Sequence, residues 1–383
     1  MPDPRPVTIA NTSPLLYLHQ CGLTDLMVKL YEEILVPPAV VQELAAGRAL
    51  GFDLPDLTVF PWVRIVRPQS MAILPAVSDL GQGEREALAM AAETPGAILI
   101  IDDGLARRYD VVHLSNQIRR FPRRSRVTAT IHDMTCWLMP ELHTEANVRA
   151  DRQFAERVLK RADRLIAVSE NTRRDAMRLL DLPPEKIEVI YSGVADAFFD
   201  AKPRPASRPY VLFVGTIEPR KNVDTLLDAW AQLKPSLRDE FDLLVAGPEG
   251  WGAQQTMARL RQGANGVRYL GYVSESELPS LTAGAAVFVY PSLYEGFGFP
   301  VAQAMAARVP AITSNLSSLP EIAAAGSVLV DPRSTAELCG GLDRLLTSPS
   351  LRAKLARDGY RQAQEFRWET CARKSLEFFH KLG

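Results

Sequence analysis

The chain has 383 residues, of which 47% are hydrophobic and 23% charged, and its formal net charge at neutral pH is −1. These values are typical of a soluble globular protein with two or three domains, and they exclude a strongly basic nucleic-acid-binding protein. Four scattered cysteines without metal-ligand spacing, and the lack of an apolar stretch of about 18 residues, predict a cytoplasmic protein without a membrane-spanning helix.

The first unit that we expect runs from Val7 to Arg108 and has an α/β pattern. Apolar runs predict strands, and amphipathic stretches between them predict helices. The expected strands are VTIA, EILVP and AILIID, and the expected helices are SPLLYLHQCG, PAVVQELAAG and residues 83–93.

The strings TSPL, VPPAV and GEREA in this unit resemble PIN-like domains. PIN nucleases gather about four acidic residues around Mg²⁺ or Mn²⁺, which activates water against a phosphodiester. The resemblance implies such a cluster at Asn11, Glu43, Glu84 or Glu86, and Asp103. Asn11 stands where the family usually has Asp, which removes one charge from the metal site. The last strand and helix of a PIN domain are missing, so a metal-dependent ribonuclease and a degenerate domain that only folds both remain open.

The middle segment repeats the α/β pattern between Tyr109 and Gly193. DVVHL, VTATIHD, RLIAVS and IEVIYSG are expected to be strands with helices between them. Seven arginines lie between Arg107 and Arg126. They are consistent with contact to an anionic lipid or a phosphorylated acceptor, but the pattern favours a solvated loop and helix face. A peripheral position on the inner face of the membrane is therefore a further expectation.

The stretch from Asp200 to Pro209 has three prolines and no apolar periodicity, which is typical of a linker. After it, short continuous apolar strands alternate with amphipathic helices to the end of the chain. This order predicts a parallel sheet covered on both faces, a doubly wound fold. Ligands of such a fold bind beyond the carboxyl ends of its strands.

Two of these strand ends carry candidate binding residues. The strand YVLFVG ends at Gly215 and leads to Arg220 and Lys221 at a helix start, where exposed N–H groups and two cations favour an anion such as a diphosphate. The later segment PSLYEGFGFPVAQAMA carries Glu295 in a glycine-containing turn. Gly296 and Gly298 allow the backbone to approach a ligand closely.

The strings GTIEPRKN and SLYEGFGFPVAQAMA, in this order, resemble glycosyltransferase family 4, the retaining sugar-nucleotide enzymes of the GT-B fold. The similarity covers the chain from Tyr109 onward. It implies that Arg220 and Lys221 hold the donor diphosphate and that Glu295 and His132 flank the donor sugar as catalytic residues. The backbone of Gly296, Phe297, Gly298 and Phe299 would support the sugar hydroxyls and phosphate.

One residue departs from the family pattern. The family usually has a second Glu, which accepts hydrogen bonds from the ribose, where this chain has Gln303. The amide oxygen still accepts one hydroxyl without charge assistance, which weakens ribose binding by about 1 kcal/mol. No Asp-x-Asp pair occurs in the sequence, so we expect a transferase that needs no metal or other cofactor.

The fold class that follows is α/β with GT-B-type Rossmann-like domains. We expect a truncated PIN-like segment over residues 1–108, a partial acceptor-side domain over 109–203, and a complete donor domain with a C-terminal crossing helix over 204–383. The predicted function is transfer of a sugar, with mannose as an analogy, from a nucleotide-diphosphate sugar to a glycan or lipid-linked acceptor. The alternatives are a PIN-type ribonuclease and a non-catalytic fusion relic.

Overall fold

The computed structural model describes residues 7–20, 24, 27, 31–70, 81–94, 97–100, 111–114 and 125–382. The chain divides into two compact units, Met1–Val127 and Thr128–Leu382. The predicted domain boundary after Arg108 lies outside the described residues. This boundary and the one after residue 203 stay predictions.

The first unit contains a parallel four-stranded sheet of order β3-β2-β1-β4. In the central strand β1, Ile9 pairs with Leu35 on one side and Leu99 on the other. The described elements of this unit are β1 (Thr8–Ala10), α1 (Thr12–Gln20), β2 (Ile34–Val36), α3 (Pro38–Ala49), a 3-10 turn (Leu57–Val59), β3 (Val63–Ile65), α4 (Gln82–Glu93), β4 (Ile98–Ile100) and β5 (Val111–Leu114).

The second unit begins with parallel strands β6, β7 and β8 and the helices around them. Ser169 begins helix α7 as an N-cap, since its side chain accepts a hydrogen bond from the N–H of Thr172. The elements are β6 (Arg126–Ile131), α5 (Thr135–Leu138), α6 (Glu145–Phe154), which continues as a π-helical turn (Ala155–Leu159), β7 (Arg164–Ala167), α7 (Glu170–Leu180), β8 (Ile187–Val189) and α8 (Asp196–Phe199).

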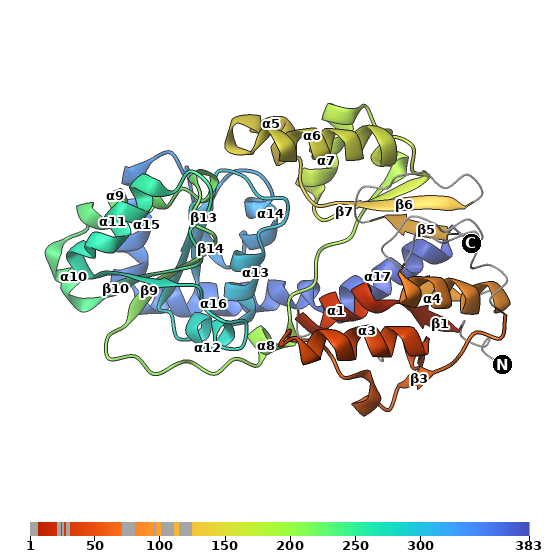
Figure 1. The fold of residues 1–383 in the computed structure, drawn as a ribbon. Helices are drawn as coiled ribbons and strands as arrows, with labels where there is room; N and C mark the ends of the chain where they lie inside the picture. Colours follow the sequence, from red (N-terminus) through yellow and green to blue (C-terminus); the bar gives the residue numbers. More distant parts are fainter. Residues whose placement is uncertain are drawn as a thin grey trace. The chain divides into compact units, whose positions relative to one another are not determined.

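The rest of this unit is built on a parallel six-stranded sheet of order β11-β10-β9-β12-β13-β14, with helices on both faces (Figure 1). The elements are β9 (Tyr210–Val214), α9 (Val223–Gln232), α10 (Pro235–Glu240), β10 (Asp242–Ala246), α11 (Gln254–Gln262), β11 (Val267–Gly271), α12 (Leu278–Ala283), β12 (Val287–Tyr290), α13 (Phe299–Ala306), β13 (Ala311–Ser314), α14 (Leu319–Ala323), β14 (Ser327–Val330), α15 (Thr335–Thr347), α16 (Pro349–Ala363) and α17 (Trp368–His380).

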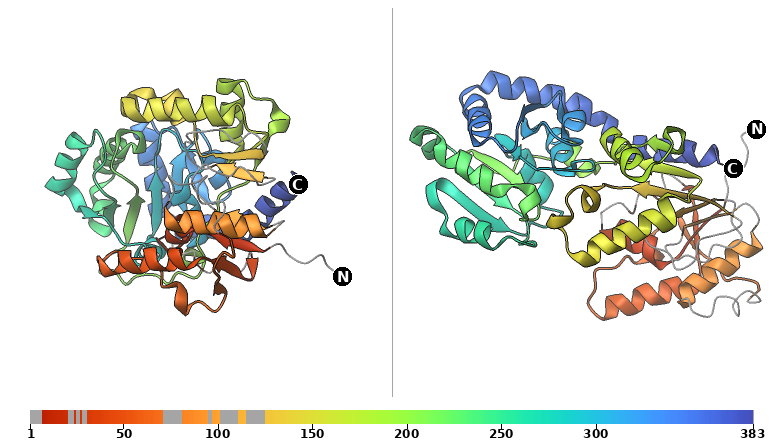
Figure 2. Two further views of the ribbon diagram at one scale, coloured as in Figure 1. Left: turned by 45° about the vertical axis from the view of Figure 1, so that its right-hand side comes forward. Right: turned by 90° about the horizontal axis from the view of Figure 1, so that it is seen from above.

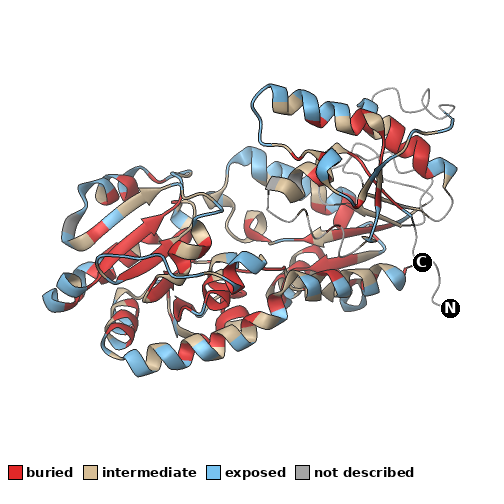
Figure 3. Cartoon of the chain, turned by 90° about the horizontal axis from the view of Figure 1, so that it is seen from below, coloured by how far each residue is buried: buried red, intermediate tan, exposed pale blue. Residues whose placement is uncertain are grey.

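The strands of this sheet are almost continuously apolar because helices cover both faces. β10, β12 and β13 are buried along their whole length. In Figure 3 the buried interior is red, and the pale blue, exposed residues lie on the helices and loops around it. This burial holds the strands of the sheet in place, and the strands in turn determine where the loops after them begin.

The strand order reverses between β9 and β12. From β9 the chain moves outward to β10 and β11, and it then crosses back so that β12 pairs with β9 on the other side. Such a switch point opens a crevice at the carboxyl edge, where open α/β sheets bind their ligands. The loops after β9 and β12 carry Arg220, Lys221 and Glu295.

The C-terminal helices α16 and α17, drawn in blue in Figures 1 and 2, follow one another along the chain. α17 lies against the β7–β8 part of the second unit. Lys381, directly after α17, forms an ion pair with Glu188 at 3.0 Å, and Arg164 lies over the ring of Phe378. The C-terminal segment therefore connects the six-stranded sheet with the β6–β8 sheet.

Candidate active site

Glu295 lies in the loop between β12 and α13 and is almost completely buried, with 9% of the residue exposed. Its Oε1 atom is within hydrogen-bonding or ion-pairing distance of four donors. These are Lys221 Nζ at 2.6 Å, Ser292 Oγ at 2.7 Å, Tyr290 Oη at 2.9 Å and Arg220 Nη1 at 3.2 Å. No hydrogen bond from the described residues reaches Oε2. The second oxygen is therefore the one available to a ligand.

The charge of Glu295 is stabilised by its neighbours. Burial opposes ionisation, but Lys221 and Arg220 outweigh it, with help from the hydrogen bonds of Lys221 and Ser292, and the pKa of Glu295 is lowered. Burial likewise works against the charge of Arg220, yet Glu295 and Glu218 together raise the pKa of that guanidinium. Glu295 and Arg220 are therefore both ionised at neutral pH.

Arg220 and Lys221 form a 3-10 turn between β9 and α9. The turn ends at Asn222, whose φ of 58° is left-handed and whose side chain donates to the carbonyls of Pro291 and Pro332. Arg220 also donates to the carbonyl of Tyr294 at 2.8 Å. An ammonium has three N–H donors, and Lys221 commits one to Glu295, so two remain for an anion.

Gly215 lies at the end of β9, before the basic turn. A Cβ atom there would meet the rings of Phe213 and Tyr290 at an ordinary contact distance of 3.5 Å. Protein packing does not require a glycine at this position. The place of Gly215 in the donor site stays a prediction.

Serines of the β13–α14 loop hold the backbone around Glu295. The Ser317 hydroxyl accepts the N–H of Glu295 at 3.0 Å, and Ser318 Oγ lies 3.0 Å from the carbonyl of Glu295 and 2.9 Å from that of Phe297. Ser317 has a φ of 55°, a left-handed conformation that is unusual for a residue with a side chain. Strain of this kind is concentrated at functional sites.

His132, directly after β6, lies next to the Glu295 loop. A Cβ atom on Gly296 would come within 1.8 Å of the His132 carbonyl oxygen and 2.8 Å of the Asp133 side chain. The His132 residue is exposed, but the surrounding protein desolvates its ring enough to lower its pKa, against the opposing charge of Asp133. His132 is therefore neutral at pH 7 and can donate or accept a proton there.

Gly296→Ala is expected to be strongly destabilising because the new methyl group has no room against the His132 backbone. We expect a loss of about 3 kcal/mol or more in the free energy of unfolding, the upper range for an overpacked site. Gly340→Ala is the matched control, since Gly340 lies in α15 with nothing within 4 Å of its Cβ position. That change should stabilise the helix by about 0.5–1 kcal/mol. Thermal melting of both variants checks this, and equal melting temperatures would contradict it.

The first turn of α7 binds the same loop from another direction. Ser169 and Thr172 donate their hydroxyls to the carbonyl of Gly296 at 2.6 and 3.0 Å. Tyr294 donates to Asp175 on α7 at 2.6 Å. The Tyr294–Gly296 segment is thus held by α7 as well as by the serines after β13.

Glu321 on α14 adds a charged contact to α7. Its carboxylate accepts the N–H groups of Glu170 and Asn171 at 2.7 and 3.1 Å. These are free donors of a helix N-terminus, where a carboxylate is also favoured by the helix dipole. Tyr191 donates to the same carboxylate, and burial is the main cause of its strongly raised pKa.

The remaining predicted donor residues lie at the start of α13. Phe297 is buried and packs against Tyr191, Phe299 and Phe366, whereas Phe299 is 43% exposed. Gly298 has a φ of 99°, which requires a glycine. Gln303 is half-buried in α13, and its side chain has no hydrogen bond among the described residues, so the amide stays available.

The predicted PIN-type carboxylates have structural roles in the first unit. Glu43 accepts the N–H of Gly83 at 2.8 Å and the hydroxyl of Thr12, and Glu86 accepts the N–H of Ala39 at 3.2 Å. Glu84 caps its own helix through the N–H of Gly81. Asn11 is buried after β1, and Asp103 lies outside the described residues.

No group of three or more His, Cys, Asp or Glu side chains in the described part of the chain is arranged to hold a metal ion. The described carboxylates accept hydrogen bonds from protein donors, and a PIN-type metal site at these residues and Asp103 stays a prediction. Among the described helices, none is both long and apolar enough to span a bilayer. Most of the arginine-rich segment considered for lipid contact lies outside the described residues.

Sequence reasoning missed several residues that hold Glu295. Tyr290, Ser292, Ser317 and Ser318 all contact it or its loop, but none was singled out. For Tyr290 and Ser292 a signal was present, because both lie where β12 reaches its carboxyl end. The two serines after β13 carry no such local signal.

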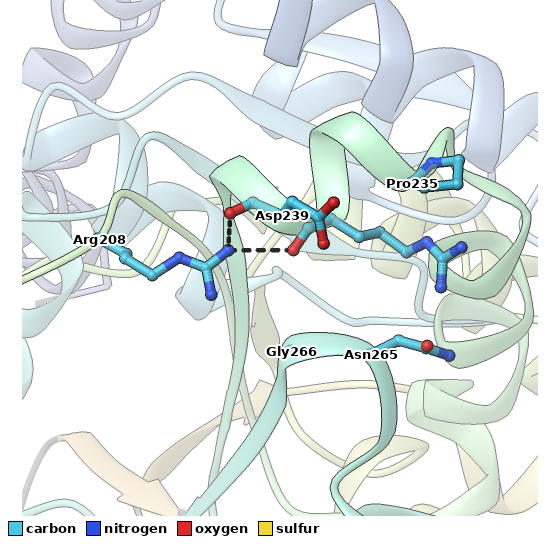
Figure 4. Close-up of a pocket in the computed structure, with 6 residues that line it drawn as sticks. Arg208, Pro235, Asp239, Asn265 and Gly266 are labelled. Atoms are coloured by element: carbon cyan, nitrogen blue, oxygen red, sulfur yellow. Dashed lines mark hydrogen bonds between the residues drawn. The ribbon is translucent and has the colours of Figure 1, made fainter.

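A separate hollow of about 300 Å³ lies beside α10, away from these residues (Figure 4). Arg208 points to the carboxyl end of α10, where it donates to the carbonyls of Arg238 and Asp239. Cations commonly bind the last carbonyls of a helix in this way. Helix capping therefore explains Arg208, and the other basic residue of the hollow, Arg238, donates to the carbonyl of Leu233.

Solved structures share this architecture. Sucrose-phosphate synthase from Thermosynechococcus elongatus superposes with a TM-score of 0.64 over 99% of each chain at 18% identity. HepE from Anabaena, solved with UDP and glucose, gives 0.64 over 98% of this chain and 100% of its own at 19% identity. The fold class that these neighbours define is that of the GT-B glycosyltransferases.

Sequence comparisons identify the family. The model "Glycosyl transferases group 1" matches residues 194–362, "Glycosyltransferase Family 4" matches 68–198, and a PIN-domain model matches 7–111. O-antigen chain mannosyltransferase B of Escherichia coli is 31% identical over 272 residues, which are 68% of this chain and 71% of the relative. D-inositol 3-phosphate glycosyltransferase of a Nocardioides strain is 28% identical over 341 residues, 76% and 73% of the two chains. The chain belongs to glycosyltransferase family 4 and carries a PIN-like segment at its N-terminus.

These findings confirm the predicted recognition, the α/β GT-B fold class and the assignment as a glycosyltransferase. The family 4 match begins at residue 68, ahead of Tyr109, where the sequence similarity was placed. The transferase-like sequence thus overlaps the end of the PIN-like segment.

Proposed function

We propose that this glycosyltransferase transfers mannose from a nucleotide-diphosphate mannose to a glycan acceptor with retention of the anomeric configuration. The observation that carries the proposal is the convergence of Arg220 and Lys221 on Glu295 at the switch point of the parallel sheet. Two cations and one carboxylate at that edge match a donor with an anionic diphosphate and a sugar rich in hydroxyls.

In the proposed reaction, the C1–oxygen bond to the diphosphate breaks as the acceptor hydroxyl bonds C1 from the same face. The leaving diphosphate gains negative charge, which Arg220 and Lys221 stabilise electrostatically. The proton of the acceptor hydroxyl passes to the departing phosphate oxygen. Oε2 of Glu295 accepts a hydrogen bond from a sugar hydroxyl, and neutral His132 faces the sugar from the β6 side.

Mannose as the donor sugar is supported by the relative from Escherichia coli, whose name states a mannosyltransferase of the O-antigen chain. Other relatives are named as serotype-specific and MMP α-(1→4)-mannosyltransferases. HepE was solved with UDP and with UDP-glucose, which supports a nucleotide sugar as the donor without fixing its base. GDP-mannose and UDP-glucose are therefore the two donors to compare.

The test incubates the full chain with either donor and a synthetic α-mannose disaccharide as the acceptor. We expect turnover of GDP-mannose, and a product whose one-bond C1–H1 coupling in NMR identifies the α-anomer of the donor. A β-linked product would overturn retention. Turnover of UDP-glucose alone would overturn mannose as the donor sugar.

A further inference from the structure

The proposed function of Glu295, on which the following role of Tyr290 rests, requires one fixed orientation of the Glu295 carboxylate. We propose that Tyr290 is a positioning residue, whose hydroxyl fixes Oε1 of Glu295 so that Oε2 faces the donor sugar. Tyr290 ends the central strand β12 and is completely buried. Its hydroxyl donates to Oε1 at 2.9 Å.

The other donors to Oε1 are less suited to this task. Lys221 and Arg220 have long side chains, and in the proposed reaction both must also meet the diphosphate. The single hydroxyl hydrogen of Ser292 is shared among three acceptors, because its Oγ lies 3.2 Å from the Tyr294 carbonyl and 3.3 Å from that of Arg220, besides Glu295. A donor that serves Glu295 alone is needed to keep one carboxylate orientation during the reaction.

Tyr290 fits that requirement. Among the described residues, Glu295 is the acceptor that its hydroxyl bonds. The ring is held by stacking on Phe213 and Phe288, with centroid distances of 5.7 and 6.2 Å, and by Lys221 Nζ at 5.4 Å. A buried phenol on a rigid strand loses little freedom when it makes its hydrogen bond, so the direction of the O–H is fixed by the sheet.

Tyr210 provides a matched control. It lies on the neighbouring strand β9, is 2% exposed, and donates its hydroxyl to the carbonyl of Leu281 at 2.7 Å. Tyr210→Phe and Tyr290→Phe thus each remove one buried hydroxyl from adjacent strands of the same sheet. The first loses a hydrogen bond to backbone and the second a hydrogen bond to the Glu295 carboxylate.

The experiment measures kcat and the donor KM of the full chain with GDP-mannose and the α-mannose disaccharide, over a range of pH. We expect Tyr290→Phe to lower kcat about tenfold, as for the loss of one hydrogen bond to a charged group, and to leave KM within about twofold. Removing a donor from the carboxylate raises its pKa, so the acid limb of the pH–rate profile should move to higher pH. Tyr210→Phe should keep the kcat and the acid limb of the parent protein, with a similar decrease in melting temperature.

Two results would overturn the proposal in different ways. If Tyr290→Phe keeps the parent kcat and pH profile while Glu295→Gln is inactive, Tyr290 does not position Glu295 and the proposed function stands. If Glu295→Gln is as active as the parent protein, the role of Glu295 fails, and the positioning role of Tyr290 fails with it.

Discussion

The Arg220→Ala, Lys221→Ala double variant should lose affinity for the donor nucleotide by about 10²–10⁴-fold. Each charge-assisted hydrogen bond contributes about 1.5–3 kcal/mol, and about 1.4 kcal/mol corresponds to a factor of ten in affinity. Both side chains are mostly buried, and both form ion pairs with Glu295, at 3.2 and 2.6 Å. Calorimetric titration with GDP and with UDP measures the loss.

Arg259→Ala is the control for the double variant. Like Arg220, Arg259 bonds two carboxylates, those of Asp224 and Asp228, but it lies on α11 and its side chain is 38% exposed. Its removal should leave nucleotide affinity within about twofold of the parent protein, since exposed ion pairs contribute little. Equal losses in both variants would contradict a diphosphate site at Arg220 and Lys221.

The double variant should also acquire a characteristic pH dependence of stability. Without its two cations Glu295 stays buried, and burial then raises its pKa above the unfolded value. The folded state then retains a proton that the unfolded chain releases, so stability falls as the pH rises past the unfolded carboxyl pKa. We therefore expect the double variant to melt further below the parent protein at pH 8 than at pH 5.

Glu295→Gln is expected to lower kcat/KM by about 10²–10³-fold, the range for loss of one preorganised electrostatic group. The amide has nearly the same shape, so Tyr290 and Ser292 keep an acceptor, but the negative charge between Lys221 and the donor sugar is gone. Initial rates with GDP-mannose and the α-mannose disaccharide provide the measurement.

Glu337→Gln tests whether the loss is specific to the site. Glu337 is a carboxylate of α15 that accepts the N–H of Asp331, and its conversion to the amide should leave kcat/KM unchanged. A Glu295→Gln enzyme as active as Glu337→Gln would show that the buried carboxylate serves the fold alone.

The sequence was sufficient to predict the doubly wound sheet and the two strand ends that are followed by the candidate binding residues. Continuous apolar strands between amphipathic helices predicted the parallel sheet, and they placed Arg220, Lys221 and Glu295 after the carboxyl ends of two such strands. The structure brings these residues together because parallel strands have their carboxyl ends at one edge whatever their separation in the chain.

The contacts that orient Glu295 were not predictable in this way. Ser317 lies after a strand that does not carry a charged group, and its left-handed backbone has no glycine or asparagine to signal it. The contacts of the PIN-like carboxylates were not predictable either. Glu43 and Glu86 each accept a backbone N–H group from the helix that carries the other, which depends on tertiary packing. Their role as metal ligands, which the resemblance implies, stays a prediction.

The segment between β13 and α14 performs two tasks within a few residues, and this restricts its length. Ser317 and Ser318 form hydrogen bonds with the backbone of the Glu295 loop. Glu321, on the helix that follows, accepts hydrogen bonds from the first N–H groups of α7. One residue inserted after Ser318 would turn Glu321 by about 100° around the helix and carry it away from those amides. Most surface loops tolerate insertions and deletions, but here the number of residues is fixed by two partners at once. Homologous chains that bind their donor in the same way should therefore vary in composition along this loop far more readily than in length.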